Sequence, residues 1–446
     1  WPGNAVKPRG FPASATHWAA DRSNRLLVQR SLKYVVDCGS MTMYASARDR
    51  EISKVISQWG IWTKVDFLFV SHAHADHVNG LRKLFDPTSG LRVETVFMPL
   101  LSVEERLFAF ARTSVEDPLA ASDDFYREFT ADPIAALTQL EPTRIVLVRR
   151  GTQEGNAPFA NPDTDGDSPT GAQILMGEQQ DWKPVGSGVI GEHRPADGER
   201  VSPATDQTKN NARPIYQVNV LEMPDTVGLL VTDKNSIQWL FSPYIDPLVK
   251  TKEREFLEKL AALLFLSVED LATEAAKSNF RLELLTKHES VLRQAYMDVE
   301  KDLNLTSMCL YSGPARPPTS SDGVFVRSFQ AGSYFEGPHA KRCGWLGTGD
   351  ADLKTQSRRK SFFKHFGALL ENVQTLTLPH HGSEHNFHRE LLDKIRPKFC
   401  VAAADKVGKW RHPGSGVVQA VASFGAFVSV VTSGTKSLVE DEVYLW

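Results

Sequence analysis

Residues 71–77 read Ser71-His72-Ala73-His74-Ala75-Asp76-His77, so three histidines and one aspartate fall within six residues. The apolar run over residues 65–70 precedes them and predicts a buried strand, while an apolar, basic segment through Leu84 predicts the start of a helix. Because side chains alternate along extended backbone, His72 and His74 are expected to point to one side of the strand end. Asp76 and His77 lie where the chain turns, so they can approach a second centre nearby.

Imidazole and carboxylate ligands together suit Zn, Mn or Fe better than Ca or Mg. The stretch therefore predicts a metal site at the end of a strand. A solvated polar loop that happens to be rich in histidine is the alternative, and the specific His-x-His-x-Asp-His spacing argues against it.

This spacing resembles the first metal motif of the metallo-β-lactamase superfamily. The resemblance implies an α/β fold, namely an αββα sandwich with two divalent metal ions, Zn or Mn, at the edge of its sheets. It also implies that His72 and His74 bind the first ion and that Asp76 and His77 bind the second. Two ions about 3.5–4 Å apart can clamp both oxygens of a displacement and deprotonate a bridging water near neutral pH.

Two later motifs resemble the same superfamily. Residues 343–350 end in a Gly-Asp turn after a predicted strand, and the resemblance implies that Asp350 bridges the two ions. Residues 379–383, Pro-His-His-Gly-Ser, follow another predicted strand, and the resemblance implies that His381 binds the second ion. The neighbouring His380 is the alternative ligand.

Further residues are expected to support this site or to contact the substrate. Asp37, at the end of a predicted strand, resembles the residue that positions the metal loop from behind, although a simple turn residue is the alternative. Most members supply a third histidine to the first ion, whereas Asn304 and Ser307 stand at the matching place here. The first ion is then completed by water or substrate, as catalytic sites allow, or the site is weakly occupied, damaged or mononuclear. The full set with supporting roles is Asp37, Asn304, Ser307, His380 and Ser383.

The order Gly-Asp-Ala, Pro-His-His-Gly-Ser and His-Pro resembles one branch of the superfamily, the soluble domain of the DNA-uptake protein ComEC and its free-standing relatives. The resemblance covers residues 25–100, 214–245 and 303–446. It implies hydrolysis of phosphodiester bonds in DNA by a metal-bridging hydroxide. The candidate catalytic residues are Asp76, Asp350 and His412.

The chain is expected to form one such domain with two insertions. Residues 1–150 would form its first half, 214–245 its continuation and 303–446 its second half. Residues 151–213 are dense in Gly, Pro, Asp, Asn, Ser and Thr, which predicts a long surface insertion. Leucines at helical spacing over 246–302 predict two or three inserted helices, which would serve packing, a protein partner or a lid.

The composition is ordinary for a globular protein, with 41% hydrophobic and 24% charged residues and a net charge of −3. Four cysteines without paired spacing predict free thiols in a reducing compartment. No uninterrupted run of 18 apolar residues occurs, so no membrane span is predicted and a cytoplasmic location is expected. From Lys341 onward, 15 Lys and Arg stand against 10 Asp and Glu, so this part is locally basic.

Three functions compete. The first is a metal-dependent phosphodiesterase, a nuclease whose basic residues bind the anionic backbone, with an ordinary solvated basic face as the alternative explanation of those residues. The second is an acyl or lactone hydrolase with the same two ions. The third is a partner-binding protein with a non-catalytic metal site, although six ligands exceed the four that a closed structural zinc needs. The basic residues in question are Lys354, Arg358, Arg359, Lys360, Lys364, Lys406, Lys409 and Arg411.

Overall fold

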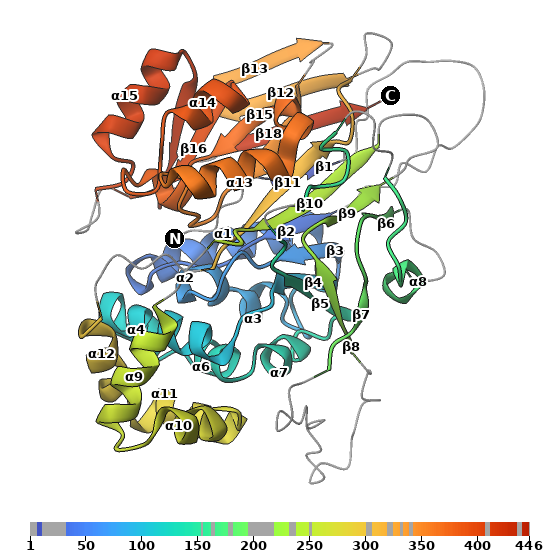
Figure 1. Cartoon of the computed structure of the whole chain (residues 1–446). Helices are drawn as coiled ribbons and strands as arrows, with labels where there is room; N and C mark the ends of the chain where they lie inside the picture. The colour runs from blue at the N-terminus through green and yellow to red at the C-terminus, as the bar shows by residue number, and fades with distance from the viewer. Residues whose placement is uncertain are drawn as a thin grey trace.

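A computed structural model describes the chain over residues 7–10, 33–152, 155–161, 166–176, 182–194, 218–231, 238–248, 252–299, 306–318, 324–330, 333–338, 342–405, 411–434 and 439–445. Two mixed β-sheets lie face to face between two groups of helices, as Figure 1 shows. The expected α/β class is confirmed.

The first sheet has six strands in the order β2-β3-β4-β5-β8-β7. Its strands are β2 (Tyr34–Val36), β3 (Lys64–Phe69), β4 (Arg92–Pro99), β5 (Arg144–Arg149), β8 (Asn219–Pro224) and β7 (Gly191–Glu192). The first five run parallel, so their carboxyl ends meet at one edge, while β7 is antiparallel to β8.

The second sheet has eight strands in the order β17-β16-β15-β14-β11-β10-β9-β6. Its strands are β17 (Phe427–Val431), β16 (Phe399–Ala403), β15 (Val373–Thr377), β14 (Gly344–Gly347), β11 (Met308–Pro314), β10 (Trp239–Ile245), β9 (Val227–Val231) and β6 (Trp182–Gly186). Strands β17 to β14 are parallel to their neighbours, and the remaining pairs are antiparallel. Among the places where the chain passes between the two sheets is the short turn between β8 and β9.

A separate four-stranded sheet lies outside these two. It contains β1 (Lys7–Gly10), β18 (Val439–Leu445), β12 (Val324–Gln330) and β13 (Ser333–Pro338). The sequence predicted only β12 of these four strands.

An aromatic layer joins the two large sheets. In β3, alternation turns Phe67 and Phe69 toward the other sheet and Leu68 toward the helices. The ring of Phe69 stacks on Phe97 at 5.0 Å and on Phe241 of the opposite sheet at 5.8 Å. Because both faces of β3 are buried at its carboxyl end, residues 67–70 before the first loop are all apolar.

Helices from the first third of the chain cover the outer face of the six-stranded sheet. They are α1 (Ala45–Trp59), α2 (Ala75–Val78), α3 (Leu81–Leu84), α4 (Val103–Glu116), α5 (Pro118–Ala121), α6 (Asp124–Ala131) and α7 (Pro133–Thr138). A capping box of Ser102 and Glu105 starts α4. The helix expected in the segment through Leu84 is the short α3, and α2 precedes it. Gly80 between them approaches Cys38 so closely that a Cβ would lie 2.9 Å from its Sγ.

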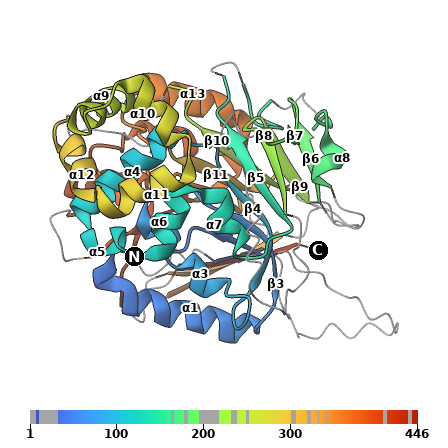
Figure 2. The ribbon, with the colours of Figure 1, turned by 90° about the horizontal axis from the view of Figure 1, so that it is seen from below.

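The helical insertion packs on this same layer, as the view in Figure 2 shows. Its helices are α9 (Glu253–Leu263), α10 (Val268–Ala275), α11 (Ser278–Lys287) and α12 (Glu289–Met297). Phe108 of α4 contacts the rings of Phe256 and Tyr296, each at 5.2 Å between centroids, and Arg127 of α6 pairs with Glu289 at 3.1 Å. The insertion therefore shares the core that supports α4; a protein partner for it stays a prediction.

Three helices cover the outer face of the eight-stranded sheet: α13 (Gln356–Phe366), α14 (Glu390–Ile395) and α15 (Ser415–Phe424). The helix α15 begins at Ser415, after Gly414. In the described residues, no helix combines the length and the apolar character that crossing a bilayer requires. All four cysteines are buried and free, as expected, whereas their compartment stays a prediction.

Residues 151–213 differ from the expected surface insertion in their described parts. They contain α8 (Ala172–Leu175) and strands β6 and β7, which form edges of the two large sheets. Trp182 and Val185 of β6 are buried. The strand was missed because it is short and is flanked by Gly, Pro and polar residues that otherwise predict loops.

Candidate metal centre

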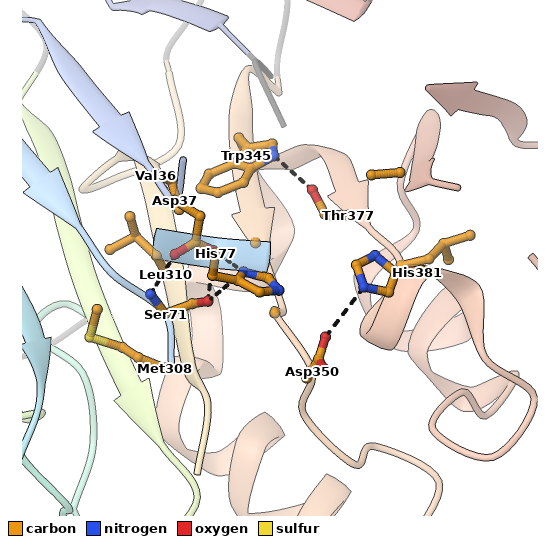
Figure 3. A pocket seen from close by; sticks show the side chains of 14 residues that line it. Val36, Asp37, Ser71, His77, Met308, Leu310, Trp345, Asp350, Thr377 and His381 are labelled. Carbon is orange, nitrogen blue, oxygen red and sulfur yellow. Dashed lines mark hydrogen bonds and ion pairs between the residues drawn. The ribbon is translucent and has the colours of Figure 1, made fainter. Parts of the chain in front are cut away.

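The predicted ligands come together where three strands end. Residues 71–77, the first loop, follow β3, Asp350 follows β14, and residues 379–383, the second loop, follow β15. The Met308 N–H donates to the Ser71 carbonyl at 2.8 Å, which ties the first loop to the eight-stranded sheet. Figure 3 shows the side chains of His77, Asp350 and His381 around the pocket at this place.

Six side chains form two groups that could each hold a metal ion, and they are the six predicted ligands. In each group, one possible ligand atom per residue lies within 4.8 Å of the others. The first group is His72, His74 and Asp350, and the second group is Asp76, His77 and His381. Asp76 and Asp350 thus belong to different groups, as the predicted ligand sets require.

The Asp350 carboxylate lies between the two groups. Its Oδ2 is 3.5 Å from His72 Nε2 and 3.9 Å from His74 Nδ1, whereas its Oδ1 is 3.8 Å from His381 Nε2. One oxygen therefore faces each group, which is the arrangement a bridging ligand needs.

Buried polar atoms without partners support cation binding here. In the described residues, His74 Nε2, His77 Nε2 and Asp350 Oδ1 are buried and have no hydrogen-bond partner. Leaving a buried polar atom unsatisfied costs about 1–3 kcal/mol. Imidazole and carboxylate at these positions fit a divalent transition metal, so these residues suit the metal ions that the sequence predicted.

In the first group, His72 has its ring proton turned away from the centre. The Ser71 hydroxyl donates to Asp37 Oδ2 at 2.6 Å, so its oxygen accepts from His72 Nδ1 at 2.9 Å. His72 Nε2 is then left with its lone pair, 3.1 Å from His74 Nδ1. Two nitrogens this close can share a cation between them.

Electrostatics prepares the two groups differently. Burial, with help from Arg112 and His72, lowers the pKa of His74 well below its ordinary value, so this ring is neutral. Burial opposes ionisation of Asp350, but the surrounding histidines, His380 first, hold the pKa of that carboxyl well below its usual range. Burial also disfavours charge on His77, but Asp76 and then Asp37 raise its pKa to about 9, so metal binding must displace a proton there.

Asp37 supports the first loop from behind, at the place the sequence predicted for it. Its Oδ1 accepts from the Ser71 N–H at 2.7 Å, and its Oδ2 accepts from His77 Nδ1 at 2.9 Å (Figure 3). A carboxylate on the far nitrogen of a ligating histidine fixes the ring and increases its basicity.

Ser307 supports Asp350. Its hydroxyl accepts from the Asp350 N–H at 3.0 Å, and a Cβ on Gly349, which has φ +49°, would lie 2.3 Å from the same oxygen. Only glycine fits this turn, and the turn sets the direction of the Asp350 carboxylate. Asn304 lies outside the described residues.

The second loop has an unusual backbone. His380 (φ 45°, ψ 57°) and His381 (φ 58°, ψ 19°) are both left-handed, which costs about 1–3 kcal/mol for each residue. Ser383 holds the loop, since its N–H donates to the His380 carbonyl at 2.9 Å and its hydroxyl accepts from the His385 N–H at 3.2 Å. Strain of this kind persists where the surrounding structure holds the backbone in place, and it is typical of active sites and ligand-binding sites.

His412 belongs to neither group. Its ring lies 5.8 Å from that of His380, and burial followed by the charge of His380 lowers its pKa to about 4. Its catalytic role stays a prediction. His193 pairs with Glu222 at 2.7 Å, and neither it nor His288 joins the described groups, whereas His339 lies outside the described residues.

Two contacts of the first loop could not be read from the sequence. The Tyr126 hydroxyl of α6 donates to the carbonyl of Ala73, between the two ligand histidines, at 3.1 Å, and lies 2.9 Å from Thr113 Oγ1 of α4. These hydrogen bonds fasten α4 and α6 to the loop. Neither residue carries a sequence signal that distinguishes it from an ordinary core residue.

Arg112, next to Thr113 on α4, is a cation that the sequence did not single out. Its Nε donates to Glu116 Oε1 at 2.9 Å, which reads in the sequence as an ordinary helix pair. Burial opposes its charge, but Glu116, Tyr296 and Asp350 raise the pKa of Arg112 above its ordinary value. The charge of Arg112 lowers the pKa of His74, and the charge of Asp350 raises the pKa of Arg112, so Arg112 is coupled electrostatically to the first group.

The expected basic track along α13 is wrong for two of its arginines. Arg358 donates to Asp352 Oδ2 at 3.2 Å, and Arg359, only 4% exposed, donates to Glu390 Oε2 at 2.7 Å. These arginines attach α13 to its neighbours, because a buried guanidinium needs acceptors more than it favours a solvent-facing helix. Lys406 and Lys409 lie outside the described residues.

No protein-family model matches this chain, and neither does any curated protein. The geometry of the site therefore carries the functional conclusion.

Proposed function

We propose that this protein is a metal-dependent phosphodiesterase of the metallo-β-lactamase type, and that it acts as a nuclease with DNA as its substrate. The observation that carries the proposal is the Asp350 carboxylate, with one oxygen toward each of two ligand groups. Two sheets between two layers of helices, with the ligands at the strand ends, also agree with that superfamily.

Each group has a defined part in this proposal. His72, His74 and Asp350 would hold one Zn or Mn ion, and Asp76, His77 and His381 would hold the other. Such ions, when bound, polarise phosphoryl oxygens and lower the pKa of water. Asp37 keeps the His77 ring oriented, and Ser307 keeps the Asp350 turn in place.

An anionic substrate is favoured over a neutral lactone by the charge of Arg112. The Arg112 side chain is only 13% exposed, and its charge acts on His74 and Asp350, so it would attract a phosphate where solvent screens it less than at the open surface. A neutral acyl or lactone substrate carries no net charge that this guanidinium would attract. The candidate cation for binding substrate therefore moves from α13, where the sequence suggested it, to α4.

The test compares substrates with Mn and with Zn. Single-stranded DNA, duplex DNA, RNA and a chromogenic phosphodiester are set against a panel of lactones. Cleavage of the phosphodiesters is expected, and lactone turnover without it would replace the proposal by an acyl hydrolase.

The Arg112→Gln variant tests the anionic substrate. It is expected to raise the KM for DNA at least about tenfold, because a charge-assisted contact of about 1.5–3 kcal/mol is lost. Arg127→Gln on α6 is the matched control, since Arg127 pairs with Glu289 instead. An unchanged KM in Arg112→Gln would contradict the role of this residue.

A further inference from the structure

The first group is one histidine short. The resemblance of the sequence to the superfamily implies a third histidine on the first ion, and the described residues place only His72, His74 and Asp350 together there. Neither His193 nor His288 can supply it. A further ligand of the first group would lie beside Asp350 Oδ2, the oxygen that faces His72 and His74.

His380 lies beside that oxygen. Its Nε2 is 3.6 Å from Asp350 Oδ2, a separation equal within 0.3 Å to those of His72 and His74. His381 Nε2 is instead 3.8 Å from Oδ1. The two adjacent histidines of the second loop thus face different oxygens of one carboxylate, and hence different groups.

The hydrogen bonds of His380 leave the nitrogen near Asp350 free to bind a cation. Asn386 donates through Nδ2 to the carbonyls of Asp350 and Ala351, at 3.3 and 3.4 Å, so its Oδ1 must be the atom 3.2 Å from His380 Nδ1. His380 Nδ1 then carries the proton and Nε2 the lone pair. Ligating histidines commonly donate their other ring nitrogen in this way.

The left-handed pair explains how neighbours can diverge. With both residues at positive φ, the rings of His380 and His381 lie 5.7 Å apart at 67° to each other. An extended segment would have sent them to opposite faces of a strand, and only one would have reached the site. The left-handed backbone therefore allows both rings to reach the site.

We propose that His380 is a ligand of the first ion, together with His72, His74 and Asp350, so that the His380–His381 pair is divided between the two ions. The inference rests on the metal-dependent function proposed above. His380 is not among the three side chains whose atoms already lie within 4.8 Å of one another, so its ring moves toward His72 when the ion binds. Its side chain is 23% exposed, which leaves room for that movement.

The experiment measures metal affinity and not catalysis. Co²⁺ is titrated into the whole chain, and its visible absorption and equilibrium dialysis report ligand number, stoichiometry and Kd. The His380→Gly variant removes the ring and accepts the left-handed backbone. One of the two ions is expected to bind more than about tenfold weaker. This loss of affinity exceeds the smallest losses seen when a residue that only supports a ligand is replaced.

Two backgrounds assign the affected ion. In His381→Gly, which retains the first ion, adding His380→Gly should weaken the remaining ion by the same factor. In His72→Ala, which retains the second ion, adding His380→Gly should leave the Kd of the remaining ion unchanged. His385→Ala is the matched control and should leave both ions in place. His380→Asn, which also tolerates positive φ, replaces His380→Gly if the glycine variant does not fold.

Other outcomes overturn the inference. An unchanged Kd in every background would make His380 a residue that contacts only the substrate, and an effect confined to His72→Ala would assign it to the second ion. These results are separate from the proposed function, because two ions bound as expected without any phosphodiester cleavage would contradict the function and leave the role of His380 standing.

Discussion

The two histidine loops reach one site by opposite backbone routes. The first loop leaves β3 extended, and His74 still has φ −84° and ψ 150°, so alternation alone directs its first two histidines. The second loop is left-handed at His380 and His381. The directions of ligands can therefore be read from the spacing in the first loop but not in the second.

The loops also differ in what supports them. The first is held by side chains from separate elements, Asp37 after β2 and Tyr126 on α6. The second is held by Ser383 and Asn386, which follow closely in sequence, and by backbone hydrogen bonds to Gly349 and Gly414, none of which lies on a helix. Changes to distant helices are thus expected to reach the first loop more than the second.

The largest effect is expected where the loops share a ligand. Asp350→Ala should lose both ions and all hydrolysis, because one oxygen faces each group, and the loss should exceed the roughly 10–100-fold typical of supporting residues. Metal analysis of dialysed protein measures it. Asp352→Ala is the matched control, since that carboxylate binds the N–H groups of Lys354 and Thr355. Two retained ions in Asp350→Ala would contradict a shared ligand.

Removing one ligand from each loop should separate the ions. His72→Ala is expected to keep only the second ion, and His381→Gly only the first, because each residue belongs to one group. Glycine is used at position 381 because φ is positive there. Stoichiometry by native mass spectrometry measures the outcome. Loss of both ions in either variant would show that the groups do not fill independently.

A smaller effect is expected behind the first loop. Asp37→Asn should weaken the second ion about 10–100-fold, because His77 loses the anionic partner of its Nδ1. Competition with a chelator gives the Kd. Asp66→Asn is the matched control, since Asp66 accepts from the Lys33 N–H earlier in β3. If both variants weaken binding equally, the effect belongs to the strand and not to His77.

The smallest effect is expected at Tyr126. Tyr126→Phe leaves the Ala73 carbonyl without its donor, which should lower the free energy of unfolding by about 1–3 kcal/mol and weaken the first ion less than tenfold. Urea unfolding with and without metal measures both. Thr113→Val keeps the bond to Ala73 and should leave the ion affinity unchanged. A larger loss of affinity in Thr113→Val would refute the role given to Tyr126.

Much of the site could be predicted from the sequence because its ligands follow short, buried strands. The run before residue 71 and the strand before residue 379 are apolar enough to be recognised, and all six predicted ligands lie in the two groups. Asp37 could be placed because it follows a predicted strand in a stretch that resembles a superfamily motif, and the structure shows that this strand, β2, pairs with β3.

The remaining features depend on contacts that local patterns do not encode. The direction of His380 depends on a left-handed backbone and on Asn386. In the sequence, Arg112 has the spacing of an ordinary helix ion pair with Glu116. Arg358 looks like a solvent-facing basic residue, and only the structure shows its hydrogen bond to Asp352. Strand β6 is recognisable only from its partner β9.

The position of Asp350 between the groups has a consequence for biosynthesis. Both groups draw ligands from the first loop and from residues that the ribosome adds much later, so neither group is complete in a growing chain. Domains generally fold as units once enough of the chain has emerged. A nascent chain released early, or a fragment cut between the first loop and Asp350, would therefore carry ligand histidines but neither complete group.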